Sequence, residues 1–210
     1  MAESYLSVSG ITETQKIIEK SRFIATSAHV CGEDEARDFI NKIPAKYRDA
    51  THNCFAYIAD DLGNFPRFSD DGEPQGTAGM PMLEVIKNNR LYEVAVVVTR
   101  YFGGIKLGAG GLVRAYAGAV AENLSAAQKV MYETCAESRY TAEYPAVDAV
   151  LRYFSETGAN VLSTDYQNEV TFTVAVKKRD EEAFNSNLIN RLNGKIKIQK
   201  LKEYFFPFKI

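Results

Sequence analysis

Residues 99–120, TRYFGGIKLGAGGLVRAYAGAV, decide the fold of this 210-residue chain. Directly before them, the β-branched apolar run at 94–98 predicts a strand that is buried on both faces. Five glycines follow at a density typical of a backbone that takes positive φ or is approached closely by another group. They are Gly103, Gly104, Gly108, Gly110 and Gly111. Apolar residues then recur at helical spacing up to Leu124, which predicts a helix that begins near Gly110 or Gly111.

This order of strand, glycine loop and helix also predicts an anion site. The first turn of a helix has unpaired N–H groups and a partial positive charge, and glycines let a ligand reach them. Arg100, Lys106 and Arg114 flank the loop, so we expect it to bind a phosphate, a nucleic-acid backbone or a carboxylate. The spacing matches neither the Walker loop nor the dinucleotide fingerprint. The alternative is structural: the glycines let a small-residue helix pack tightly on the sheet, while Arg100 and Arg114 pair with the protein's own carboxylates.

Composition narrows the class of protein. The net charge of −2 gives no overall basic field, so nucleic-acid binding would need a local patch. The cysteines, Cys31, Cys54 and Cys135, are far apart and odd in number, which fits free thiols in a reducing compartment. The N-terminal residues lack the features of a signal peptide, and no apolar run approaches the roughly 20 residues of a membrane span. We therefore expect a cytoplasmic protein that does not bind a membrane.

The pattern of the chain predicts two α+β domains, 1–136 and 137–210, which meet at a short hinge at 134–137. In the first domain, Pro44 is expected to end an amphipathic helix, and Pro81 suits the first turn of the next one. The expected strands of this domain lie at 5–8, 14–18, 22–30, 53–59 and 94–98.

The second domain has the order strand, helix, strand, strand, helix, strand, which is the ferredoxin-like pattern. Strict apolar alternation at 170–176 predicts one of its strands. Gly158 is expected to end its first helix, and Asp180 is expected to cap its second.

Three stretches carry a resemblance to a known family: RYFGGIKLGAGGLVRAY at 100–116, HNCFAY at 52–57 and SDDGEPQGTAGMP at 69–81. They resemble, in the same order, the motifs of the IMPACT family, whose bacterial branch is the YigZ type. The resemblance implies an N-terminal α/β sandwich similar to the second domain of a small-subunit ribosomal protein, a fold shared with GHMP kinases. It also implies a C-terminal domain similar to the ferredoxin-like last domain of elongation factor G. Eukaryotic relatives restrain amino-acid-starvation signalling at the ribosome, through partners and an extra N-terminal domain.

The loop at 69–79 is rich in carboxylates, with Asp70, Asp71 and Glu73 close together. Such a loop could hold Mg²⁺ and keep waters for a phosphate partner. A solvated turn that caps the following helix would have much the same composition. The chain lacks the glycine-serine loop of GHMP kinases, so we do not expect kinase activity, and we assign no metal or cofactor.

His52 and Cys54 are two residues apart on an expected strand, so they point to the same face. They could act as base and nucleophile, or as two metal ligands. Two ligands do not complete a zinc site, and His29 is the only other histidine. The commoner arrangement is a buried Cys54 and a hydrogen-bonded His52 that support the neighbouring loop.

The end of the chain combines basic and aromatic residues. Such a combination on an open sheet could bind single-stranded RNA through phosphate contacts and stacking. An edge strand that lysines protect from aggregation, with aromatic residues in the core, would give the same pattern. The residues are Lys195, Lys197, Lys200, Lys202, Tyr204, Phe205, Phe206 and Phe208.

Together these observations predict a translation-associated regulatory or binding factor. Its expected partners are RNA, the ribosome or translation-related proteins, and the glycine loop is the expected contact with a phosphate-bearing ligand. The alternative is an enzyme for metal-assisted phosphate handling or hydrolysis, which would use the acidic loop with His52 or Cys54. A protein-binding module would show neither activity nor salt-sensitive RNA affinity.

Overall fold

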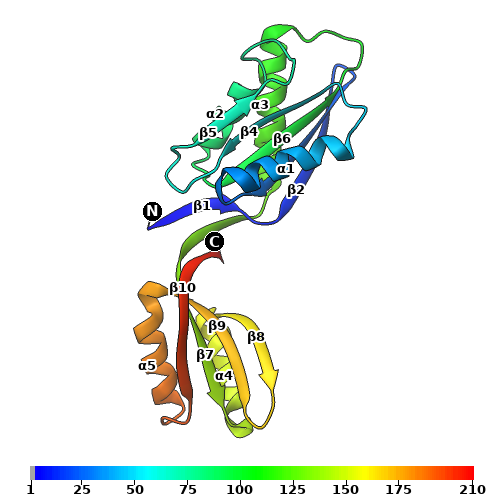
Figure 1. Cartoon of the computed structure of the whole chain (residues 1–210). Coiled ribbons are helices and arrows are strands. Elements are labelled where there is room, and N and C mark those ends of the chain that lie inside the picture. Colours follow the sequence, from blue (N-terminus) through cyan, green and yellow to red (C-terminus); the bar gives the residue numbers. More distant parts are fainter. Residues whose placement is uncertain (1–2) are drawn as a thin grey trace. The chain divides into compact units, whose positions relative to one another are not determined.

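A computed structural model describes residues 3–210 of the chain. The chain forms two compact units: one contains the residues up to Met131 together with Lys209–Ile210, and the other is Tyr132–Phe208 (Figure 1). Each unit has its own hydrophobic core. No helix in the described part is both long enough and apolar enough to cross a membrane.

A five-stranded sheet with the order β2-β3-β6-β4-β5 lies at the centre of the N-terminal unit, and all neighbouring strands are antiparallel. The strands are β2 (Ile11–Ile18), β3 (Ser21–His29), β6 (Val94–Tyr101), β4 (His52–Ile58) and β5 (Pro66–Ser69). β6 is the middle strand. Val94, Val96 and Val98 pack into one core and Ala95 and Val97 into another, which confirms the prediction of a strand buried on both faces.

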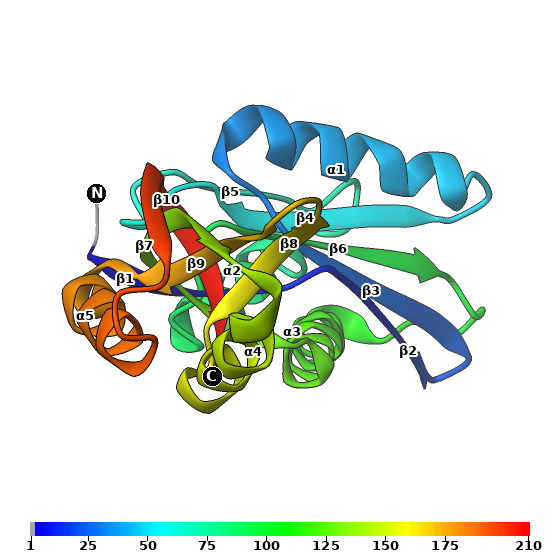
Figure 2. The same cartoon turned by 90° about the horizontal axis from the view of Figure 1, so that it is seen from below.

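Three helices cover the two faces of this sheet (Figure 2). α1 (Gly32–Lys46) packs on one face, and α2 (Gly79–Asn88) and α3 (Gly108–Ala126) pack on the other. The predicted end of the first helix at Pro44 was wrong, because α1 continues to Lys46. The Tyr47 N–H donates to the carbonyls of Ile43 and Pro44, so the last turn closes around the proline.

Other elements of this unit also differ from the sequence prediction: β2 begins three residues earlier than expected, and β6 ends three residues later. α3 begins at Gly108, slightly earlier than expected. The short strand β5 was not predicted, and it pairs with β4 at the edge of the sheet. The N-terminal strand β1 (Ser4–Val8) was predicted, and its Leu6 forms a parallel bridge with Leu91.

The C-terminal unit has the sheet order β10-β7-β9-β8, in which the last strand lies beside the first. Its elements are β7 (Lys129–Ala142), α4 (Val147–Thr157), β8 (Asn160–Tyr166), β9 (Val170–Lys177), α5 (Glu181–Arg191) and β10 (Lys197–Lys209). Aromatic residues of both helices and of the sheet meet in one core, among them Tyr140, Phe154, Phe172 and Phe184. This arrangement confirms the ferredoxin-like prediction.

Two expectations for the second half of the chain were wrong. Residues 134–137, the expected hinge, lie within β7, which runs without a break from Lys129 to Ala142. Asp180 makes no side-chain capping bond to α5. It ends a short 3₁₀ turn with helical φ and ψ, whereas a capping residue has extended backbone. Gly158 does end α4, with φ +66° as expected for a glycine at this position.

Candidate functional site

The glycine loop, residues 102–107, connects the central strand β6 to α3. At its start, the Gly103 N–H donates to Ser21 Oγ at 3.2 Å. A Cβ at Gly103 would lie 2.1 Å from the backbone carbon of Lys20, so only glycine fits there. The loop is therefore held against the turn between β2 and β3.

The other glycines have different environments. Gly104 and Gly108 take positive φ, +84° and +67°. Gly111 is packed so closely against the preceding turn that a Cβ would lie 3.0 Å from its nearest neighbour. A Cβ at Gly110 would have ordinary room, with the flexible Arg114 Nη1 at 3.6 Å. Neither steric crowding nor backbone conformation within the protein therefore requires a glycine at position 110. The absence of a side chain at Gly110 leaves the helix end accessible.

No side chain of the described residues caps the N-terminal end of α3. Leu107 is the N-cap residue and makes no capping hydrogen bond, and the first turn contains no acidic residue. Gly108, Ala109 and Gly110 are all exposed. Because the first N–H groups of a helix have no partner within the helix, this end can bind an anion from outside.

A cavity of about 320 Å³ opens beside this helix end. The first residues of α3 form one wall. The other side chains that line it include Glu73, Pro74, Arg100, Phe102, Lys106 and Leu112. The cavity therefore combines cationic, anionic and apolar groups from the acidic loop, β6, the glycine loop and α3.

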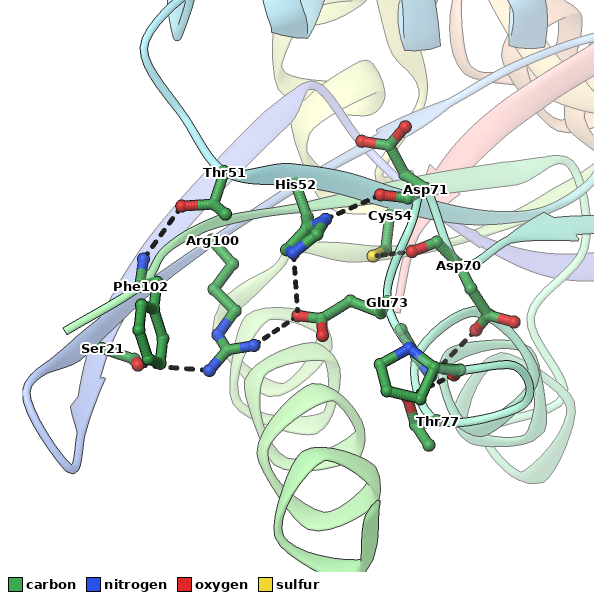
Figure 3. Close-up of polar contacts among 12 residues, drawn as sticks. Ser21, Thr51, His52, Cys54, Asp70, Asp71, Glu73, Thr77, Arg100 and Phe102 are labelled. Carbon is green, nitrogen blue, oxygen red and sulfur yellow. Dashed lines mark hydrogen bonds and ion pairs between the residues drawn. The ribbon is translucent and has the colours of Figure 1, made fainter. Parts of the chain in front are cut away.

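Arg100 is 5% exposed and belongs to an ion pair with Glu73, which is 8% exposed. Arg100 Nη1 donates to Glu73 Oε1 at 2.6 Å, and Nη2 donates to Ser21 Oγ at 3.3 Å. Tyr116 donates to the same carboxylate oxygen at 2.8 Å, and His52 Nε2 lies 3.9 Å from it. Figure 3 shows Arg100 and His52 pointing toward this carboxylate. Arg100 therefore has the structural partner that the alternative interpretation required.

Lys106 and Arg114 are different from Arg100. Both are exposed, and among residues 3–210 neither forms a salt bridge with a carboxylate. Both line a second cavity of about 430 Å³, together with Ile18, Glu19 and Ile105. Two of the three predicted cationic residues thus stay available to an external anion.

Asp70 caps the N-terminal end of α2. Its carboxylate accepts the backbone N–H groups of Gly76, Ala78 and Gly79 at 2.8, 3.0 and 2.8 Å. Burial raises the pKa of Asp70, but the three N–H donors outweigh it and hold the pKa below its usual range. The carboxylate is therefore ionised at neutral pH and neutralises this helix end from within.

The other two carboxylates of the acidic loop also have partners within the protein. Asp71 accepts the N–H of Asn53, and Glu73 is paired with Arg100. Within the part of the chain that the structure describes, no group of three or more His, Cys, Asp and Glu side chains could hold a metal ion. The three carboxylates point to separate partners instead of converging.

His52 and Cys54 both contact the main chain of the acidic loop. His52 Nδ1 lies 2.7 Å from the Asp71 carbonyl oxygen, and the Cys54 thiol donates to the Asp70 carbonyl at 2.9 Å. Burial raises the pKa of Cys54 to about 12, so the thiol is protonated at neutral pH. A protonated, buried thiol is a poor nucleophile. His52 and Cys54 therefore hold the acidic loop in place through these two contacts.

The lysines of β10 are mostly paired with carboxylates. Lys197 contacts Glu169 at 2.9 Å, and Lys200 contacts Glu181 at 2.8 Å. Lys202 lies 3.8 Å from a carboxylate oxygen of Glu137. The aromatic residues Tyr204, Phe206 and Phe208 pack beside Cys135 and Ala175. This strand therefore presents less free positive charge than its sequence indicates.

Phe102 and Pro74 line the cavity, and neither residue was predicted from the sequence to belong to the site. Phe102 directly follows the buried strand and yet remains 47% exposed. The available signal was an aromatic residue at the first position of the glycine loop, where the strand no longer needs an apolar side chain.

Comparison with known proteins identifies the family. The Impact N-terminal domain matches residues 19–124, and a domain of unknown function, DUF1949, matches residues 141–195. The IMPACT family member YvyE of Bacillus subtilis is 40% identical over 95% of this chain and 92% of its own length. The family member YigZ of Escherichia coli is 34% identical over 96% of this chain and 100% of its own.

A solved crystal structure, described as that of a hypothetical protein, is similar along its whole length. It has a TM-score of 0.63 and 33% sequence identity, and the similarity covers 96% of this chain and 99% of the other. Both domains and the order of the motifs therefore agree with relatives of the same length, and this chain belongs to the IMPACT family.

Proposed function

We propose that this chain is a cytoplasmic, translation-associated factor that binds phosphates of single-stranded RNA at the N-terminal end of α3. One observation carries the proposal: α3 begins with the exposed residues Gly108, Ala109 and Gly110 and has neither a capping side chain nor an acidic residue in its first turn. Uncapped helix ends of this kind favour phosphate.

The surrounding charges support an anionic ligand. Lys106 and Arg114 line one cavity beside the glycine loop and form no salt bridge with the carboxylates of the described chain. The buried charges of Arg100 and Glu73 offset each other. Glu19 also lines the cavity of Lys106 and Arg114, so the two basic residues outnumber the one carboxylate, and the local net charge is positive although the chain as a whole carries −2. The chain belongs to the IMPACT family, and the resemblance to that family implies a role at the ribosome for its eukaryotic members, which supports RNA as the source of the phosphates.

The geometry gives less support to the enzymatic alternative. The Cys54 thiol is protonated at neutral pH, and its hydrogen bond to the acidic loop is structural. Asp70, Asp71 and Glu73 are each committed to a different partner. The alternative would therefore require the acidic loop to rearrange, whereas the helix end is already accessible.

Salt dependence tests the proposal. We expect the affinity of the purified chain for a fluorescent single-stranded RNA to fall with salt concentration. Each phosphate contact on a single strand contributes about −0.7 to the slope of log K against log salt. A Lys106→Ala/Arg114→Ala variant removes two such contacts, so its slope should be less steep than that of the wild type by about 1.4.

Lys42→Ala/Arg48→Ala is the matched control. It removes the same charge from exposed positions on or just after α1, which covers the opposite face of the sheet. The control should keep the slope of the wild-type chain. Absence of RNA binding by the wild type, or equal slopes for both double variants, would refute the proposed site.

A further inference from the structure

The cavity beside α3 has an apolar part that a simple anion would leave unused. Phe102, Pro74 and Leu112 line it together with Lys106 and the buried pair Arg100 and Glu73. Its volume of about 320 Å³ lies at the small end of the range for ligand sites, which begins near 300 Å³. An inorganic phosphate would occupy only the helix end, whereas a ligand with an attached ring system would also cover the apolar part.

Phe102 is held in place but is not buried. Its backbone N–H donates to Thr51 Oγ1 at 3.1 Å, and the Arg100 guanidinium carbon lies 5.5 Å from the ring centroid. The residue is nevertheless 47% exposed. An aromatic ring that is supported by a cation and open to solvent is a suitable stacking platform for a nucleic-acid base.

Arg100 supplies a second, independent indication of a ligand. Its side chain lines the cavity and is 5% exposed, and its Nε is buried without a hydrogen-bond partner among residues 3–210. Buried polar groups nearly always have a partner, and a lone unsatisfied donor in a cavity wall requires an explanation. An acceptor atom of a bound ligand would satisfy it.

We infer that the cavity receives one unpaired nucleotide of an RNA strand. The nucleotide's phosphate binds the first turn of α3 and Lys106, its base stacks on Phe102, and one of its acceptor atoms takes the hydrogen bond of Arg100 Nε. This inference rests on the proposed function and specifies its ligand. Double-stranded RNA is excluded as the preferred form, because its bases are already stacked within the helix.

The chain contains no tryptophan, so a single substitution can report stacking directly. A Phe102→Trp variant titrated with a short single-stranded RNA should show quenched tryptophan fluorescence, because the base lies against the ring. Phe65→Trp is the matched control: Phe65 is 50% exposed and does not line the cavity, so its fluorescence should stay unchanged. Quenching of both variants, or of neither, would overturn the inference.

A second measurement separates the base from the phosphate. An RNA with abasic positions keeps every phosphate, and it should bind the wild-type chain about tenfold more weakly than the intact strand. Phe102→Leu should lose a similar factor for intact RNA while its affinity for the abasic strand stays unchanged. Thermal unfolding of the variant would verify that it remains folded.

The outcomes distinguish the inference from the proposed function. In one outcome, RNA affinity depends on Lys106 and Arg114, Phe102→Leu binds intact RNA as tightly as the wild type does, and the wild type binds the abasic strand as tightly as the intact strand. This outcome would support the proposed phosphate site and would refute the inferred nucleotide site. If the wild type binds neither strand, both fail. Tighter binding of duplex RNA than of single-stranded RNA would also overturn the inference.

Discussion

The N-terminal unit contains two loops that each lead into a helix on the same face of the sheet. The two loops differ in whether they cap the N-terminal end of the helix that follows. The acidic loop before α2 supplies Asp70, which accepts the backbone N–H groups of Ala78 and Gly79 at the start of the helix and that of Gly76 just before it. The glycine loop before α3 supplies no carboxylate and leaves the exposed first turn uncapped. One helix end is neutralised by the protein, and the other is available for a ligand.

This difference gives the acidic residues a structural role in place of the metal-binding role that the sequence suggested. In sequence they looked like a possible metal site, whereas the structure uses Asp70 as a cap and Glu73 as the partner of Arg100. Arg100 likewise looked like a member of the anion site, although its main contacts are with Glu73 and Ser21. The charges of the two loops are therefore best separated into a structural group and an exposed group.

The largest expected effect comes from the structural group. Arg100→Met would leave the buried Glu73 carboxylate without its charge partner, and loss of one member of a buried pair costs about 3–5 kcal/mol. Urea unfolding followed by circular dichroism would measure this loss. Arg114→Met, at an exposed position that forms no salt bridge within residues 3–210, should change the unfolding free energy by less than about 0.5 kcal/mol. Equal effects would contradict the separation of the two groups.

A smaller effect is expected at the cap of α2. Asp70→Ala should lower the unfolding free energy at pH 7 by about 1–2 kcal/mol, because three N–H groups lose their acceptor. The folded pKa of Asp70 is depressed, so its contribution is fully present above the unfolded pKa of about 4 and is lost as pH falls through the folded value. The difference between variant and wild type should therefore shrink below about pH 4. A constant difference in urea titrations across this range would argue against the cap.

The smallest change in stability is expected where the glycine loop is made to resemble the acidic loop. Ala109 is exposed in the first turn of α3, and Ala109→Asp would place a carboxylate at the uncapped end. We expect stability to rise by about 0.3–1 kcal/mol through the helix dipole. RNA affinity should fall, because the new charge repels phosphate.

Ala109→Asn is the neutral control for this variant. It has nearly the same size as the aspartate variant and should largely keep the RNA affinity of the wild type. Differential unfolding and fluorescence anisotropy would measure the two effects on the same samples. An aspartate that weakened the fold, or that left RNA affinity unchanged, would show that the end of α3 is not an anion site.

The sequence predicted those features that depend on local pattern. The apolar run at 94–98 predicted the buried strand β6, and strict alternation at 170–176 predicted β9. The ferredoxin-like order followed from the sequence of elements. The short β5 was missed because four residues beginning with proline carry little strand signal. The continuous β7 was missed because its burial pattern does not alternate strictly.

The location of the candidate site could be predicted from the sequence, but which of its basic residues are paired with carboxylates could not. The glycines and basic residues marked the start of α3, and the structure places Lys106 and Arg114 near it, exposed and without a salt bridge to any described residue. Nothing in the local sequence distinguishes Arg100 from these two. Its partner Glu73 lies 27 residues earlier, and only the pairing of β6 within the sheet brings the two together. Contacts of this kind depend on tertiary structure.

The contact of Gly103 with the turn between β2 and β3 has a consequence for the order of folding. Its hydrogen bond to Ser21 joins residues 82 positions apart. Contacts between such distant residues require closure of a long chain segment and tend to form late. The hairpin of β2 and β3 is synthesised before β6 and the glycine loop, so this contact has to wait for the later segment. A chain that has been synthesised through α3 but is only partly folded would therefore contain every residue of the binding surface before it acquires the shape that binds.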